Sequence, residues 1–245
     1  FRNGLGPISL GYAYPSVNEA VERQLRDGVV FSYSHPLEVE IAERLVEIIP
    51  CAERVRFLKT GGEAMAAVHR LARGFTDRDH ILTCGYHGWV NSTGKGVPAA
   101  TKSTYTALPW GNVDAFQTAI DAQGAANIAA ISVACDYAEI EKGHQFLPAL
   151  RSMCDRIGAL LIFDEIVTGF RLRRAGAQEY FGVTPDLAVF AKGISNGVPL
   201  SAYLGRADVM DAVQSVVISS TFGGDTLALA AADAVLDVYE QEDVI

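Results

Sequence analysis

The sequence predicts an α/β fold with a mostly parallel central sheet and helices on both faces. Short runs of apolar and β-branched residues alternate with longer stretches that have helical spacing, which is the pattern of α/β domains. Several of the short runs are apolar almost throughout, as expected for strands that are covered on both faces. Hydrophobic residues make up 49% of the 245-residue chain, which is enough for a packed core.

Six strands and six helices are expected from this alternation. The predicted strands are Arg54–Lys59, His80–Cys84, Ile128–Ala134, Leu160–Asp164, Leu187–Ala191 and Ser201–Gly205. The predicted helices are Val17–Arg26, Pro36–Ile49, Glu63–Phe75, Val113–Ala122, Phe146–Ile157 and Thr226–Tyr239. No internal repeat or obvious linker interrupts the pattern, so residues 1–245 are expected to form one domain.

The composition disfavours several kinds of partner. The formal net charge of −9 argues against a nucleic-acid partner and against an anionic membrane surface. No apolar run reaches the roughly 18 residues that are needed to span a bilayer.

The four cysteines are scattered and form no C-x-x-C pair, so neither a metal site nor a redox motif is predicted. Scattered thiols favour a reducing, cytoplasmic location.

Two residues of opposite charge follow neighbouring predicted strands. Asp164 comes directly after four large apolar residues, and Lys192 follows the run Leu187–Ala191. Ligands of open α/β sheets bind beyond the carboxyl ends of the strands, so both residues are candidates for a site. A lysine that is partly desolvated there has a lowered pKa and can act as an amine nucleophile. A carboxylate there can keep a pyridine nitrogen protonated, so that the ring accepts electrons.

Each of these two residues also has an ordinary structural explanation. Lys192 could be a surface lysine at a strand end whose amine reaches water. Asp164 could cap a following helix or pair with an arginine such as Arg171.

A glycine pair precedes a predicted amphipathic helix. In Thr60-Gly61-Gly62-Glu63, the threonine and the glutamate have the spacing of a capping box, which is a sufficient structural reason for the motif. Two glycines at a helix N-terminus also expose backbone N–H groups that favour an anion such as phosphate. The motif is neither a Walker A loop nor a dinucleotide-binding fingerprint.

Two further segments are candidates for ligand contacts. Tyr86 follows a predicted strand between flanking glycines, where it could stack on a flat ring or simply be a buried turn residue. The segment Ser219–Gly224 places hydroxyls and glycines before another predicted helix, which is a second possible anion site.

Taken in this order, these motifs resemble the class III aminotransferases of fold type I, and most closely their glutamate-1-semialdehyde aminomutase branch. The resemblance runs from Gly6 to Gly224 and therefore covers nearly the whole chain. Its most specific part is Gly158–Arg171, with Ala191-Lys192-Gly193 after it. The resemblance implies the large domain of the fold, pyridoxal 5′-phosphate (PLP) as cofactor, and a homodimer with shared active sites.

The resemblance also implies a role for each matching residue. Lys192 would form the Schiff base with PLP and then move a proton at the substrate carbon. Asp164 would pair with the pyridine nitrogen. Thr221 would reach the cofactor phosphate of the neighbouring subunit, and the loop Phe31–Ser34 would lie near that subunit's site. The other cofactor contacts implied are those of Gly61 and Gly62 with the phosphate, Tyr86 and Ile166 with the ring, and His87.

The chain departs from the family pattern at three points. Gly62 stands where the family usually has a hydroxyl, so the phosphate would have one side-chain donor fewer. Ala134-Cys135 replaces a common Glu-Pro, which weakens any claim about that segment. The N-terminal segment and the C-terminal small domain of the family are missing, so residues 1–245 are interpreted as the PLP-binding large domain and as a fragment.

The function expected from the resemblance is amino transfer between an amine or amino acid and a carbonyl compound. A close alternative is an aminomutase, which moves an amino group within one molecule. An alternative from another class is a non-catalytic dimerisation or binding domain with the same fold.

Overall fold

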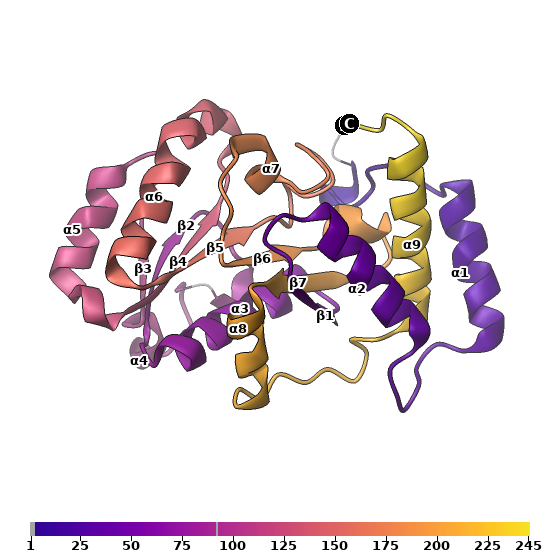
Figure 1. Cartoon of the computed structure of the whole chain (residues 1–245), viewed down its shortest axis with the longest axis horizontal. Coiled ribbons are helices and arrows are strands. Elements are labelled where there is room, and N and C mark those ends of the chain that lie inside the picture. The colour runs from indigo at the N-terminus through magenta and orange to yellow at the C-terminus, as the bar shows by residue number, and fades with distance from the viewer. Residues whose placement is uncertain (1–2, 92) are drawn as a thin grey trace.

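The computed structural model describes residues 3–91 and 93–245, which fold around a seven-stranded sheet (Figure 1). The order of the strands is β1-β7-β6-β5-β4-β2-β3. Their bounds are β1 Arg54–Leu58, β2 His80–Cys84, β3 Tyr105–Ala107, β4 Ile128–Ala134, β5 Leu160–Asp164, β6 Leu187–Phe190 and β7 Ser201–Gly205. The pairs from β3 to β6 are parallel, whereas β7 runs antiparallel to both β1 and β6.

Long and short helices precede, connect and follow these strands. Their bounds are α1 Pro15–Asp27, α2 Pro36–Ile48, α3 Gly61–Thr76, α4 Ala99–Lys102, α5 Val113–Gln123, α6 Gly143–Ile157, α7 Ala177–Phe181, α8 Ala207–Asp211 and α9 Thr226–Gln241. None of the helices within the described ranges is long and apolar enough to cross a bilayer.

The two faces of the sheet are both covered, as β5 illustrates. Leu160 and Ile162 belong to an apolar cluster with residues of α3 and α8. Leu161 and Phe163 belong to a second cluster, which includes residues of α2, α5, α6 and α9. Since successive strand residues point to opposite faces, helices pack on both sides of the sheet. The predicted α/β class with a mostly parallel sheet is therefore confirmed.

The structure corrects some of the predicted boundaries. Lys59 lies outside β1 because its backbone N–H donates to Glu63 Oε2 at 3.0 Å instead of pairing in the sheet. Ala191 lies outside β6, since the chain turns at Lys192 into a left-handed conformation. Strand β3 was not predicted, because three residues give too short a pattern. The predicted amphipathic helix buries Ala64, Ala67 and Leu71, whereas Phe75, near its end, is 39% exposed.

Candidate active site

A cavity of about 890 Å³ lies at the carboxyl ends of β2, β4, β5 and β6. Its wall includes Asp164, the last residue of β5, and Lys192, which follows β6. These two strands are parallel neighbours, with Asp164 opposite Val189. The structure therefore brings the two oppositely charged residues to one cavity, in the place where α/β sheets bind ligands.

The carboxylate of Asp164 is held in a fixed orientation. Its Oδ1 accepts a hydrogen bond from the backbone N–H of Ile166 at 3.1 Å, and its Oδ2 is bonded to His87 Nδ1 at 2.8 Å. The residue is only 6% exposed. The partner of Asp164 is thus a histidine rather than Arg171, whose guanidinium donates instead to the carbonyls of Gly6 and Val167. Asp164 is ready to accept a further hydrogen bond from a ligand in the cavity.

Lys192 has a left-handed backbone conformation and an amine whose pKa is lowered. Its φ of 51° is left-handed, a conformation that costs energy for a side chain of this kind. Burial lowers the pKa of Lys192; the Asp164 carboxylate opposes this shift, and the Arg171 guanidinium adds to it. The amine lies 3.8 Å from the point that a Cβ on Gly6 would occupy, so the N-terminal segment covers it. A lowered pKa increases the fraction of neutral, nucleophilic amine.

The N-terminus of α3 presents two backbone donors to the cavity. Thr60 and Glu63 form a reciprocal capping box, which satisfies their own N–H groups. Within residues 3–91 and 93–245, no group accepts a hydrogen bond from the N–H of Gly61 or Gly62. Both glycines line the cavity. The capping box and the anion site are thus compatible, because the box leaves the two glycine donors free.

Apolar and aromatic side chains line the space between these groups. Ile166 packs so close to Gly61 that a Cβ on that glycine would lie 2.5 Å from Ile166 Cδ1. Tyr86 and Trp89 line the cavity with 74% and 80% of their surface exposed. The cavity can therefore contact a flat ring with an aliphatic side chain and with aromatic ones.

Two predicted site residues do not line the cavity. His87 is 5% exposed and lies behind Asp164, which it contacts through its ring nitrogen. Thr221 is exposed in the loop before α9, and this loop lies beside a different groove, along β1. Within one chain, neither residue is in a position to touch a ligand in the cavity.

Glu165, to which no role was assigned from the sequence, is a buried clamp in the structure. Its carboxylate accepts hydrogen bonds from the Thr168 hydroxyl and from the backbone N–H groups of Ala177 and Gln178. Burial raises the pKa of Glu165 to about 7, although these hydrogen bonds act in the opposite direction. Glu165 therefore fixes the loop that follows Asp164. The signal in the sequence was the second acid of the Asp164-Glu165 pair.

Comparison with known proteins identifies the family. The model of the family "Aminotransferase class-III" matches residues 1–119 and 112–245, which together cover the whole chain. The chain belongs to the class III aminotransferases. These are enzymes, and the resemblance inferred from the sequence is confirmed.

Relatives and solved structures agree with this assignment. The chain is 37% identical to a glutamate-1-semialdehyde 2,1-aminomutase of Syntrophobacter fumaroxidans, over 98% of the chain and 60% of that protein. An amine transaminase from an uncultivated Pseudomonas species, solved in its PLP-bound form, superposes with a TM-score of 0.89 at 29% identity, over 99% of this chain and 66% of that one. An omega-transaminase from Sphaerobacter thermophilus superposes with a TM-score of 0.88 at 29% identity, over 97% of this chain and 61% of that one. The chain spans about 60% of the length of the curated relative.

The cofactor implied by this family is PLP, and the cavity fits it. PLP carries a phosphate, a pyridine nitrogen and an aldehyde. The free N–H groups of Gly61 and Gly62 suit the phosphate, the oriented carboxylate of Asp164 suits the nitrogen, and the amine of Lys192 suits the aldehyde. The residues of this chain thus match the three chemical groups of the cofactor.

Proposed function

We propose that this chain is the PLP-binding domain of an aminotransferase, which moves an amino group between an amine or amino acid and a carbonyl compound. The observation that carries the proposal is the shared cavity of Lys192 and Asp164. A catalyst of this type needs an amine nucleophile and an acid partner for a pyridine ring, and here neighbouring strands supply both.

Each residue has a defined part in the proposal. Gly61 and Gly62 hold the phosphate at the N-terminus of α3, and Asp164 holds the ring nitrogen. PLP, when bound, supplies a ring that withdraws electrons from the substrate carbon. Lys192 would hold the cofactor through its aldehyde group, and its amine, once the substrate amine has displaced it, would accept and return a proton at the substrate carbon. Its lowered pKa suits both tasks, since each requires a neutral amine.

The test of this proposal is the appearance of a new carbonyl compound. The purified protein is incubated with PLP, a panel of amine donors and a keto acid, and the keto or aldehyde product is measured. We expect product with the unmodified protein and none above background with Lys192→Ala. Lys142→Ala is the matched control, since this exposed lysine pairs with Glu139 away from the cavity. Equal activity of Lys192→Ala and the unmodified protein would contradict the proposal.

Intramolecular amino transfer is a second candidate function, because the curated relatives at 34–38% identity are named glutamate-1-semialdehyde 2,1-aminomutases. The two functions use the same residues and differ in the need for a second substrate. Isomerisation of a single amino-aldehyde without any amino acceptor would favour the aminomutase. Formation of a carbonyl co-product only when an acceptor is present would favour the aminotransferase.

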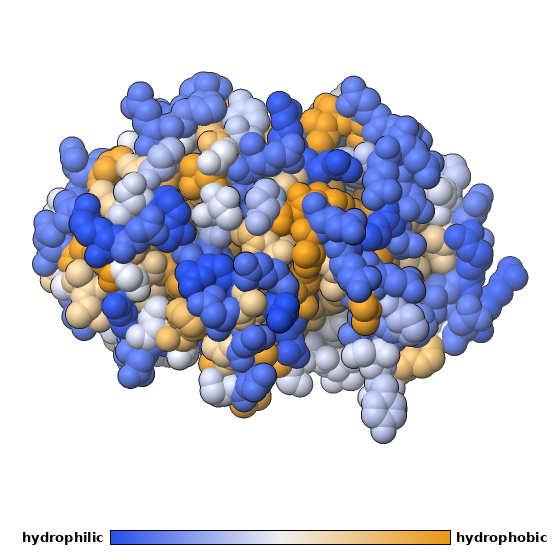
Figure 2. All heavy atoms as spheres, viewed as in Figure 1, coloured by the Kyte–Doolittle hydropathy of each residue, from blue (hydrophilic) through white to orange (hydrophobic). Residues whose placement is uncertain are grey.

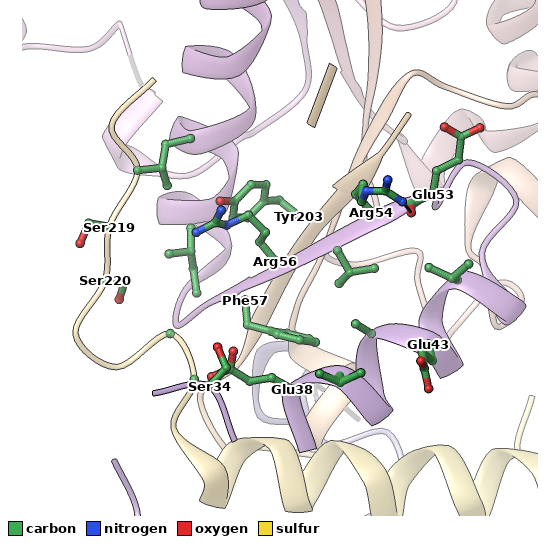
Figure 3. A pocket seen from close by; sticks show the side chains of 18 of the residues that line it. Ser34, Glu38, Glu43, Glu53, Arg54, Arg56, Phe57, Tyr203, Ser219 and Ser220 are labelled. Atoms are coloured by element: carbon green, nitrogen blue, oxygen red, sulfur yellow. Dashed lines mark hydrogen bonds between the residues drawn. The ribbon is translucent and has the colours of Figure 1, made fainter. Parts of the chain in front are cut away.

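We also propose that the protein forms a homodimer with shared active sites. A groove of about 960 Å³ runs between α2 and the edge strand β1, with Ser219 and Ser220 at one end (Figure 3). Val39 and Val46 line it with 55% and 40% of their surface exposed, among charged side chains such as Glu38, Glu43 and Arg56. Further exposed apolar side chains lie in the neighbouring segments of the chain, namely Phe31, Tyr33, Val217 and Phe222. Apolar residues also gather in the middle of the face that carries α2, among polar ones (Figure 2). Such a surface suits a second copy of the chain. Thr221, in the loop beside the groove, would then lie near the active site of that second copy.

The molar mass in solution tests the dimer. Val39→Glu and Val46→Glu each place a charge at an apolar position of α2 that lines the groove, and we expect them to shift the protein to the monomer mass in light scattering. Leu25→Glu is the control, since Leu25 is 59% exposed on α1, outside the groove. A monomeric unmodified protein would refute the proposal.

The cytoplasmic location that we propose is supported by four cysteines without disulfide bonds.

A further inference from the structure

Behind Asp164 lies a group of polar residues that the proposed function does not use. His87 is 5% exposed, and both of its ring nitrogens are bonded. Nδ1 meets Asp164 Oδ2 at 2.8 Å, and Nε2 meets the backbone carbonyl of Ser132 at 3.2 Å. A carbonyl and an ionised carboxylate only accept hydrogen bonds, whereas a neutral imidazole has one donor and one acceptor. Both bonds form only when His87 carries a proton on each nitrogen, as an imidazolium.

A second buried histidine, His69 on α3, adjoins the first. The two rings meet edge to face, with their centroids 6.0 Å apart. His69 is fully buried, and its Nε2 lies 3.0 Å from the hydroxyl of Ser132. Ser132 therefore joins the two histidines, since its carbonyl contacts His87 and its hydroxyl contacts His69. The pKa of His69 is well below its ordinary value because of burial first, then the positive charges of His87 and Arg73.

The far side of His69 fixes which nitrogen carries its single proton. Arg73 donates to the Tyr105 hydroxyl at 3.3 Å, and that hydroxyl lies 3.4 Å from His69 Nδ1. Because the hydroxyl oxygen already accepts from the guanidinium, its own hydrogen is free to point to Nδ1. The proton of neutral His69 then lies on Nε2, from which it is donated to Ser132.

We propose that His69 is a positioning residue for the cofactor ring. Neutral His69 anchors Ser132, the Ser132 carbonyl holds His87 as an imidazolium, and His87 holds the Asp164 carboxylate towards the cavity. Of the two adjacent histidines, His69 is thus neutral and His87 is positively charged. The positive charge lies beside the Asp164 carboxylate, which compensates it. This inference rests on the proposed function, because the orientation of Asp164 matters to PLP only when PLP binds here.

The protonation states are tested in the protein without cofactor, by ¹⁵N NMR of the histidine side chains at neutral pH. We expect His87 to show two protonated nitrogens and His69 to show protonated Nε2 and bare Nδ1. A neutral His87, with one bare nitrogen, would overturn the proposal. This measurement does not depend on PLP, so it separates failure of the inference from failure of the proposed function.

Positioning is tested by the affinity for PLP, followed by cofactor absorbance. Ser132→Ala removes the hydroxyl but keeps the carbonyl, and we expect it to weaken PLP binding roughly 3- to 10-fold, as the loss of one hydrogen bond would. We also expect it to alter the NMR signals of His87. His69→Leu serves as a second variant with the same expected outcome. Unchanged affinity and unchanged His87 signals in Ser132→Ala would refute the positioning role.

The chain offers a matched control for this experiment. His80 is a buried histidine whose Nε2 lies 2.8 Å from the hydroxyl of Thr106, but it begins β2 and so lies at the end opposite to the cavity. Thr106→Val removes that hydroxyl in the same way as Ser132→Ala removes its own. We expect the control to leave the PLP affinity and the His87 signals unchanged. A loss of affinity equal to that of Ser132→Ala would show a general effect on the sheet and contradict the proposal.

Discussion

Gly62→Ser should strengthen the binding of PLP. A Cβ at Gly62 would lie 3.8 Å from both Gly88 Cα and Val90 Cγ2, which is ordinary van der Waals contact. The added hydroxyl would stand in the first turn of α3, beside the free N–H groups and within the cavity wall. It would supply the hydroxyl that the family resemblance leads us to expect at this position.

The size of the effect follows from the hydrogen bond that is gained. A hydrogen bond to a charged group contributes about 1.5–3 kcal/mol, and ordering the serine side chain offsets part of it. A net gain of about 1.4 kcal/mol corresponds to roughly tenfold tighter binding. Replacing a glycine in a helix also adds up to about 1 kcal/mol of helix stability, which acts with and without cofactor and so leaves the affinity unchanged.

The assay is a titration of the cofactor-free protein with PLP, monitored by absorbance. Gly62→Ala is the control, because it gives the same helix stabilisation without a hydroxyl. Gly61→Ser is a second control, and it should weaken binding, since its Cβ would lie 2.5 Å from Ile166 Cδ1. If Gly62→Ser bound PLP no more tightly than Gly62→Ala, the phosphate would not lie at the N-terminus of α3.

Two further predictions concern ionisable groups. The pKa of Glu165 rises from 4.5 to about 7 on folding. Between these pH values the folded state therefore keeps a proton that the unfolded state has lost, so the free energy of unfolding should fall by roughly 3 kcal/mol as the pH rises from 4.5 to 7. We expect the free energy of unfolding, measured with urea, to fall less between pH 5 and pH 8 in Glu165→Gln than in the unmodified protein. An equal fall in both proteins would contradict the raised pKa of Glu165. Arg171→Met should raise the pKa of the Lys192 amine, because one cause of its lowering is removed. The pH dependence of PLP attachment should therefore move to higher pH in Arg171→Met but not in Arg171→Lys, and an unmoved profile would exclude this effect.

The sequence was informative where one rule governs many proteins. Parallel strands end at a common edge, so the charged residues that follow two apolar runs could be paired from the sequence alone. Asp164 and Lys192 were found in this way, and the capping box at Thr60 was recognised from its spacing. The sequence suggested Arg171 as a possible partner of Asp164 and did not single out His87, which is 77 positions away along the chain.

The features that the sequence missed depend on contacts between distant residues. His69 occupies a buried position of α3, where nothing local distinguishes it from an ordinary core residue, and its partner Ser132 is 63 positions away. Glu165 is recognisable as a clamp only once α7 has folded against it. Strand β3 exists because it pairs with β2 at the sheet edge, and its three residues carry too little pattern. Tertiary contacts decide these features.

The assignment of the PLP site is best tested by reducing the PLP-loaded protein with borohydride and mapping the labelled lysine by mass spectrometry. Lys59 also lines the cavity, but its amine is held in an ion pair with the Asp225 carboxylate at 3.0 Å. We predict the phosphopyridoxyl label on Lys192 and none on Lys59. A label on Lys59, or no stable label on any lysine, would contradict the claim that Lys192 and Asp164 form a PLP site.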